Sequence, residues 1–170
     1  DPDPVEVQLG SPTTWLWLDE LSVAGVLGAI RSGRGFVSAS PQGPFIELTV
    51  DGVAMGGSVG GAARGAGEAD AVRSVRCRVA GAAGEVLSLV GAAGEFARVE
   101  VAGDEFVFES EVRLSGPFVR AEVVAGASLP GIRDRVEEFA SVRGLPWGIT
   151  VAEVFAQPYR LALSNPVYLR

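Results

Sequence analysis

The sequence predicts a mainly β protein, an antiparallel sandwich of two sheets with one helix near its start. Its 170 residues, of which 48% are apolar and 21% charged, suit a folded domain rather than a disordered chain. From Phe45 onward, apolar residues alternate with polar ones, which is the period of a strand with one buried face. About seven short strands, separated by turns that contain Gly and Pro, are typical of a two-sheet sandwich.

The first part of the chain has a different pattern. Prolines restrict helix formation at the start, and residues 13–18 have the composition of a strand. A helix follows, with Ser22 as its N-cap, Arg31 in its last turn and Gly33 in the left-handed closing position. A short strand is predicted over residues 36–40. The apolar stripe of the helix repeats at i, i+3, i+4 and i+7 and consists of Val23, Val26, Leu27 and Ile30.

The alternating pattern continues to the end of the chain. Residues 56–70, rich in Gly and Ala, are predicted to form a flexible loop, and residues 126–148 a long connection with a helical turn at 132–139. On the strand near residue 120, Arg120 and Glu122 are expected to face outward. The strands expected here are residues 45–50, 74–79, 86–90, 97–101, 106–114, 119–123, 149–155 and 159–163.

Composition excludes several classes of function. The chain has no histidine, which removes the commonest general base, the usual zinc ligand and the serine–histidine arrangement. The net charge is -7 and the 14 basic residues are all arginines, scattered along the chain, so we expect no nucleic-acid partner. The longest apolar stretch, residues 23–30, is too short for a membrane span, which needs about 20 residues. The single cysteine, Cys77, is expected to be an inert core residue.

Two pairs of segments resemble a known superfamily. Residues 11–15 (SPTTW), the helix, and residues 32–38 (SGRGFVS) resemble the last helix and strand of the polymerase-and-histidinol-phosphatase (PHP) superfamily of metal-dependent phosphoesterases. The closer similarity is to the branch with carbaryl-hydrolase-like enzymes. Residues 118–122 (FVRAE) and 162–169 (ALSNPVYL) resemble the signature that closes the immunoglobulin-like tail of that branch.

The resemblance implies an architecture and a role. Residues 1–43 would be the C-terminal end of a PHP α/β barrel, and residues 44–170 an immunoglobulin-like β-sandwich. The chain would then be a non-catalytic accessory domain that packs against the catalytic barrel or positions it. The family binds divalent metals (Zn, Mn or Fe) in the barrel, so this chain is expected to hold no cofactor. Because the chain opens on Asp1 without a methionine, we expect the metal motifs upstream.

Three residues are candidates for a place near the substrate of such an enzyme. Arg34 could pair with a substrate phosphate, although an arginine that stabilises the end of a helix is the more common case. Thr13 and Thr14 could line the mouth of the barrel, although such residues more often belong to an ordinary strand. No catalytic residue and no metal ligand is assigned in this chain.

Two other classes of function stay open. A stand-alone sandwich that binds carbohydrate or a protein partner would be favoured by exposed aromatic rings, whereas burial of Trp15, Trp17 and Trp147 would count against it. Trp15 and Trp17 are expected to pack in the interior. A hydrolase that uses only carboxylates needs two acidic groups that face each other across a cleft, and no such pair can be placed.

The expected partners follow from these interpretations. The first is the upstream catalytic barrel, and the second is another copy of the chain, since the apolar face of the helix requires burial. Neither nucleic acid nor a membrane is expected. The location is left open, with the cytoplasm slightly favoured.

Overall fold

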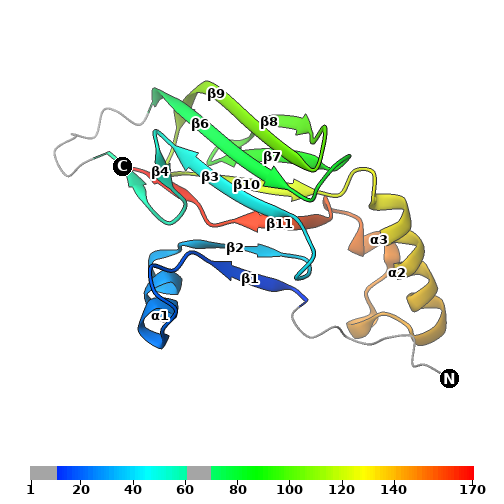
Figure 1. The fold of residues 1–170 in the computed structure, drawn as a ribbon. Coiled ribbons are helices and arrows are strands. Elements are labelled where there is room, and N and C mark those ends of the chain that lie inside the picture. Colours follow the sequence, from blue (N-terminus) through cyan, green and yellow to red (C-terminus); the bar gives the residue numbers. More distant parts are fainter. Residues whose placement is uncertain (1–10, 61–69) are drawn as a thin grey trace.

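The computed structural model describes residues 11–60 and 70–170, and the described chain is mainly β, as predicted (Figure 1). It contains two packed, largely antiparallel sheets and three α-helices. The strands are β1 (Thr13–Leu16), β2 (Gly35–Ser38), β3 (Phe45–Val50), β4 (Val53–Ala54), β5 (Ser58–Val59), β6 (Asp70–Ala80), β7 (Val86–Gly91), β8 (Gly94–Glu100), β9 (Glu105–Ser115), β10 (Phe118–Val124), β11 (Arg160–Ser164) and β12 (Val167–Leu169). The helices are α1 (Val23–Ser32), α2 (Leu129–Arg143) and α3 (Val151–Val154), with a 3₁₀ turn at Pro146–Gly148.

The larger sheet is organised around β10. On one side of β10 lie β7 and then β8, and on the other side lie β11, β2 and β1 in that order. β12 pairs with the first residues of β10, along the same edge on which β11 pairs with its last residues. β12 also pairs in parallel with β5. The smaller sheet has the order β4-β3-β6-β9, and its β6–β9 ladder runs the full length of both strands.

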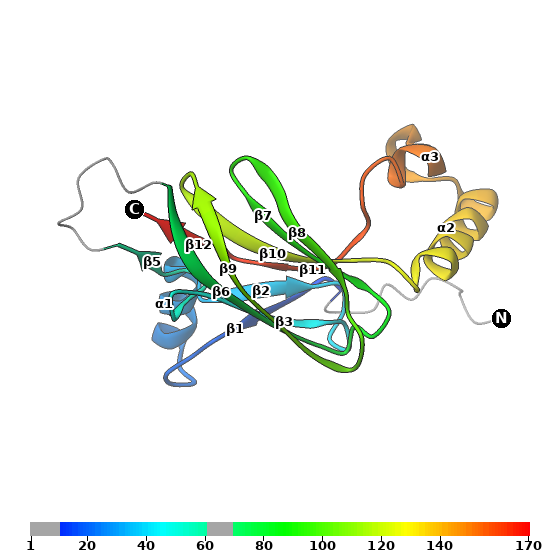
Figure 2. The ribbon, with the colours of Figure 1, turned by 90° about the horizontal axis from the view of Figure 1, so that it is seen from above.

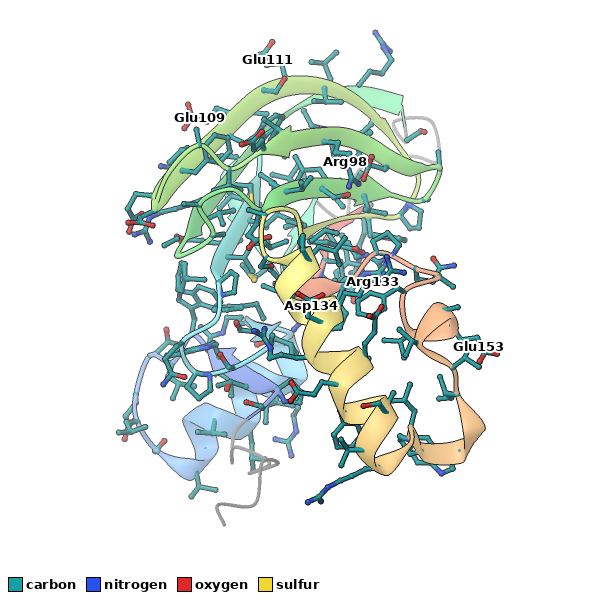
Figure 3. All side chains as sticks on the ribbon, turned by 90° about the vertical axis from the view of Figure 1, so that its right-hand side faces the viewer. Arg98, Glu109, Glu111, Arg133, Asp134 and Glu153 are labelled. Carbon is teal, nitrogen blue, oxygen red and sulfur yellow. The ribbon has the colours of Figure 1, made fainter. Side chains whose placement is uncertain are left out.

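The core lies between the facing sides of the two sheets. The alternation that predicted β3 holds in the structure, because every second side chain of this strand points into the core. The opposite face of the smaller sheet is charged, and Figure 3 shows Glu109 and Glu111 pointing away from the molecule on β9. The central core residues are Phe36, Ile46, Leu48, Val50, Val75, Cys77, Val79, Leu87, Leu89, Val119, Ala121 and Val123.

The predicted helix is confirmed as α1, together with both of its caps. The Ser22 hydroxyl accepts a hydrogen bond from the Gly25 N–H at 3.0 Å, and Gly33 closes the helix with φ of 67°. The helix connects β1 to β2, which pair with each other in antiparallel register. Only Ala29 of this helix is fully buried, so most of the apolar stripe faces away from the sandwich.

The strands before Phe45, β1 and β2, join the sandwich directly. β2 pairs with β11 in antiparallel direction, whereas neighbouring strands in an α/β barrel run parallel. The ring of Phe36 lies 5.1 Å from that of Phe45 and 5.4 Å from that of Trp17, measured between centroids. This aromatic cluster therefore spans the predicted division at residue 43. The division itself and the immunoglobulin-like strand order stay predictions.

A helical arm, residues 126–158, connects β10 to β11 and extends past the end of the sandwich (Figures 1 and 2). The predicted helical turn at 132–139 lies inside the longer helix α2. The strand predicted at 149–155 is wrong, because Thr150 and Glu153 form a capping box that begins α3 there.

Other short elements differ from the prediction at their ends. β6 begins at Asp70, four residues before the expected strand, and β12 occupies a segment for which no strand was predicted. The predicted loop at 56–70 contains β5 in its first part, and residues 61–69 lie outside the described part of the chain. Within the described residues, no helix has both the length and the apolar character that a bilayer crossing requires.

Candidate functional site

The segments that carry the family resemblance lie side by side, although they are far apart in the sequence. Phe36 of β2 lies opposite Ser164 of β11, and the Asn165 N–H donates to the Gly35 carbonyl oxygen at 3.1 Å. The Gly56 N–H donates to the carbonyl oxygen of Pro166 at 2.8 Å. We call this junction, residues 33–36 together with 164–166, the seam. It fixes the end of α1 and the start of β2 to the centre of the larger sheet.

Two glycines allow the close backbone contact beside the seam. Gly56 has φ of 84°, and a Cβ on it would collide with the Ser32 carbonyl oxygen at the end of α1. Gly33 also has positive φ, and the Cβ position that it leaves empty faces Gly56. The turn after β4 therefore packs backbone against backbone on the end of the helix.

The FVRAE and LSNP segments meet through buried polar side chains. The Ser164 hydroxyl accepts a hydrogen bond from the Ala121 N–H at 2.8 Å, inside the sheet. Glu122, expected to face solvent, is only 3% exposed, which corrects the prediction. The physical reason is an ion cluster, in which Arg160 Nε lies 2.5 Å and Arg120 Nη2 2.7 Å from the carboxylate oxygens of Glu122.

This cluster has a structural role by its chemistry. A general acid or nucleophile needs access to a substrate, whereas the Glu122 carboxylate is enclosed and neutralised by two guanidinium groups. Its neighbours across the sheet are Ser88 on β7 and Leu163 on β11. The cluster therefore ties β10 to β11 at the point where the helical arm leaves the sandwich.

The three predicted substrate-proximal residues do not form one site. Arg34 Nη1 pairs with Asp19 Oδ2 at 2.9 Å on the surface, close to the end of α1. Thr13 and Thr14 lie at the far end of β1, opposite Ser38 and Val37, about 10 Å along the strand from the level of Arg34. A role of these residues near a substrate stays a prediction.

Exposed apolar side chains cover the outer side of α1. We call Leu21, which precedes the helix, together with Val23, half-buried Val26, Leu27 and Ile30 the α1 face. Leu21 is 90% exposed and Val23 79%, and a shallow apolar hollow runs between them and Leu27. β1, which α1 contacts, is the edge strand of the larger sheet. The seam holds this face in a fixed position relative to the sandwich.

The three tryptophans have different environments. Trp17 packs on the core through Phe36 and Phe45, as predicted. Trp15 stacks on Phe36 but remains 43% exposed at the sheet edge, and Trp147 in the helical arm is 92% exposed. The exposed ring of Trp147 is the feature that a binding module would have.

Metal-binding side chains do not gather among the residues that the structure describes. Over residues 11–60 and 70–170, no three Cys, Asp or Glu side chains lie close enough together to hold a metal ion. Cys77 is buried in the core as predicted, and burial raises the pKa of its thiol to about 12, which keeps it protonated and unreactive.

Sequence reasoning missed the polar groups that matter most in the structure. Glu122 and Arg160 are 38 residues apart, so their pairing gave no local signal. Arg135 of the helical arm and Tyr159, which follows the arm, were not singled out either. Comparisons with protein-family models, with curated proteins and with solved structures each found no match.

Proposed function

We propose that the chain is a non-catalytic accessory domain of a metal-dependent hydrolase and packs against the catalytic barrel through the α1 face. The observation that supports this most strongly is the α1 face itself, where Val23, Leu27 and Ile30 of the helix and Leu21 just before it are exposed. Burial of each such side chain contributes about 1.5–3 kcal/mol. A contiguous apolar stripe of this kind indicates an interface.

The proposed partner follows from the position of the face. The α1 face lies between β1 and β2, which is where the family resemblance places the end of the catalytic barrel. The seam connects this region to the sandwich through backbone hydrogen bonds, so a barrel bound to α1 is held in one orientation. The role is to position the barrel, and the barrel supplies the metals and the chemistry.

The test starts from the reading frame that contains Asp1, in which the proposal predicts an upstream barrel. Co-expressed with this chain, the barrel is expected to co-purify with it, and Leu27→Glu should weaken the complex by at least tenfold, since it places a charge in an apolar interface. Ala24→Glu, on the side of the same helix, is the matched control and should leave the affinity unchanged. A reading frame without a barrel, or equal binding by both variants, would contradict the proposal.

The isolated chain gives two further readouts. With Mn²⁺ or Zn²⁺ added, we expect it to show no hydrolysis of a generic phosphoester, and metal-dependent turnover would overturn the proposed role. Without the barrel, the α1 face is expected to drive self-association. Sedimentation velocity should therefore show dimers for the original chain and monomers for the Leu27→Glu variant.

A second candidate function, a binding module for carbohydrate or a protein partner, is favoured by the exposure of Trp147. Aromatic rings on a surface stack on sugar rings or insert into a protein partner. If this is the function, Trp147→Ala should abolish binding to a glycan or protein ligand, whereas Leu27→Glu should not. The two variants therefore separate the two functions.

A further inference from the structure

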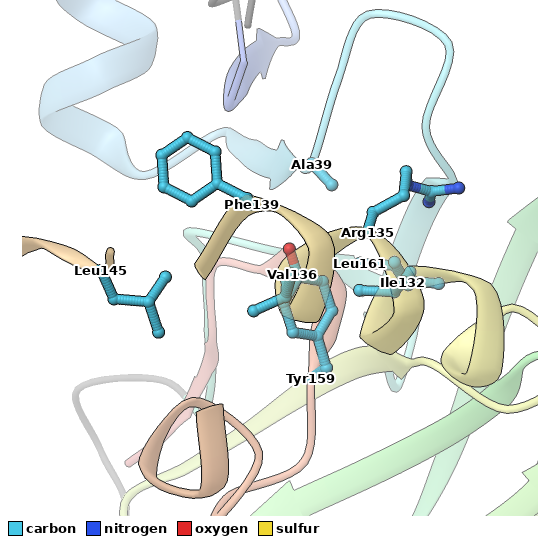
Figure 4. Close-up of a pocket in the computed structure, with 8 residues that line it drawn as sticks. All are labelled: Ala39, Ile132, Arg135, Val136, Phe139, Leu145, Tyr159 and Leu161. Atoms are coloured by element: carbon cyan, nitrogen blue, oxygen red, sulfur yellow. The ribbon is translucent and has the colours of Figure 1, made fainter. Parts of the chain in front are cut away.

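The helical arm forms one wall of an open, apolar pocket where it leaves the sandwich. This pocket of about 310 Å³ opens between α2 and the ends of β2 and β11 (Figure 4). Ile132, Val136 and Phe139 line it from α2, and Leu161 lines it from β11. Its size falls at the lower end of the range for small-molecule sites, about 300–1,000 Å³.

Two polar groups without a protein partner border this apolar surface. Arg135 lines the pocket, and among the described residues its guanidinium group makes no ion pair. Its neighbour Arg133 does, since its Nε lies 3.4 Å from a carboxylate oxygen of Glu137. The ring of Tyr159 also lines the pocket, and in the described structure its hydroxyl group makes no hydrogen bond.

We propose that this pocket binds a small aliphatic carboxylate, with the alkyl chain between α2 and β11 and the carboxylate on Arg135. Arg135 is exposed, so its guanidinium group would bind the carboxylate at the rim of the pocket through charge-assisted hydrogen bonds, while the alkyl chain lies on the apolar side chains. The Tyr159 hydroxyl offers one further donor. A more highly charged ligand, such as a phosphate, would find one cation only and an unfavourable apolar lining.

Bound ligand would connect the arm to the sandwich. Ile132 is the only fully buried side chain of α2, so few contacts fix this helix. An alkyl chain between Val136 and Leu161 would add contacts from both sides. Binding is therefore expected to slow amide hydrogen exchange in α2 while leaving exchange in β6 unchanged.

Calorimetric titration of the whole chain with octanoate tests this proposal. Octanoate should bind saturably at one site, and 1-octanol, which lacks the charge, at least tenfold more weakly. Arg135→Gln should weaken octanoate binding by a similar factor. Arg143→Gln, which removes the same charge from the same helix outside the pocket, should leave it unchanged.

A second variant separates loss of binding from loss of folding. Val136→Trp fills the pocket and should abolish octanoate binding while the circular dichroism spectrum stays that of the original chain. No saturable binding by the original chain, equal affinity for octanol, or unchanged affinity in Arg135→Gln would each overturn the proposal. None of these readouts depends on the α1 face, so the two proposals fail independently.

Discussion

Glu122 shows how a single side chain can be misjudged when its strand is considered alone. It occupies a polar position between inward-facing Ala121 and Val123, which predicts a solvated carboxylate. Arg120 and Arg160 cover it instead, and each guanidinium group keeps part of its own surface in water. The burial therefore depends on a residue that comes from the far side of the helical arm, and the local alternation cannot reveal it.

Replacement of Glu122 by glutamine tests the contribution of this ion cluster. The variant leaves two arginines without their carboxylate, and we expect a loss of about 1–3 kcal/mol in the free energy of unfolding. The matched control is Glu109→Gln, which breaks the exposed Arg76–Glu109 pair at 2.6 Å and should cost less than about 1 kcal/mol. Urea unfolding measures both, and equal losses would show that burial adds nothing to the Glu122 pairs.

At the scale of elements, the local sequence predicted a helix or strand correctly only where the residues that begin and end it lie within the segment itself. α1 was predicted correctly because its N-cap, stripe and closing glycine all lie within the segment. α3 was missed because the β-branched residues around Thr150 indicated a strand, while its capping box overrides that preference. β5 and β12 are short and exist because they pair with distant segments, so no local pattern could predict them.

The contact between the turn after β4 and the end of α1 makes a specific stability prediction. Gly56→Ala should destabilise the protein by about 1–3 kcal/mol, because the new methyl group collides with the Ser32 carbonyl oxygen and the backbone has positive φ. Gly52 also has positive φ but open space around it, so Gly52→Ala reports the conformational cost alone. Thermal unfolding of both variants checks this, and a loss at Gly52 as large as at Gly56 would argue against the close contact.

The capping box of α3 predicts a dependence on pH. The Thr150 backbone N–H donates to the Glu153 carboxylate at 2.8 Å, and the Thr150 hydroxyl donates to the same carboxylate at 2.7 Å. These hydrogen bonds lower the pKa of Glu153 below its ordinary value of 4.5. A carboxyl group whose pKa is lowered by folding stabilises the folded state when the pH is above the pKa of the unfolded state. This stabilisation is lost as the pH falls through the pKa of the folded state.

Carboxyl carbon chemical shifts measured during an acid titration follow this group directly. Glu153 should titrate below 4.5, and Thr150→Ala should move the pKa of Glu153 upward because one donor is removed. Amide signals of α3 should lose their helical shifts over the same pH range. In the Glu153→Gln variant, the shifts of α3 should not change over this range. A Glu153 carboxyl that titrates at its ordinary value would contradict the capping arrangement.

At the scale of the whole molecule, the structure separates a sandwich with a continuous core from an arm that adds little to it. The two sheets share one set of buried side chains, to which β2 contributes Phe36. The helical arm contributes Ile132 as its one buried apolar side chain and leaves Val142 and Trp147 in solvent. The sequence predicted the sandwich from its alternation, but the independence of the arm depends on packing that only the structure shows.

Removal of the arm tests this division. Val124 lies opposite Arg160, and the Ala125 N–H donates to the Tyr159 carbonyl oxygen at 2.8 Å, so the two strand ends are already paired. Replacement of residues 126–158 by Asn-Gly would close them with a two-residue hairpin turn.

We expect the shortened chain to fold and to unfold cooperatively. Its free energy of unfolding should fall by about 1–3 kcal/mol, because the Glu85 carboxylate loses its bond from the Gly126 N–H. Its circular dichroism should show less helix and unchanged strand, and octanoate binding should disappear. A chain that fails to fold after this change would show that the arm is part of the core.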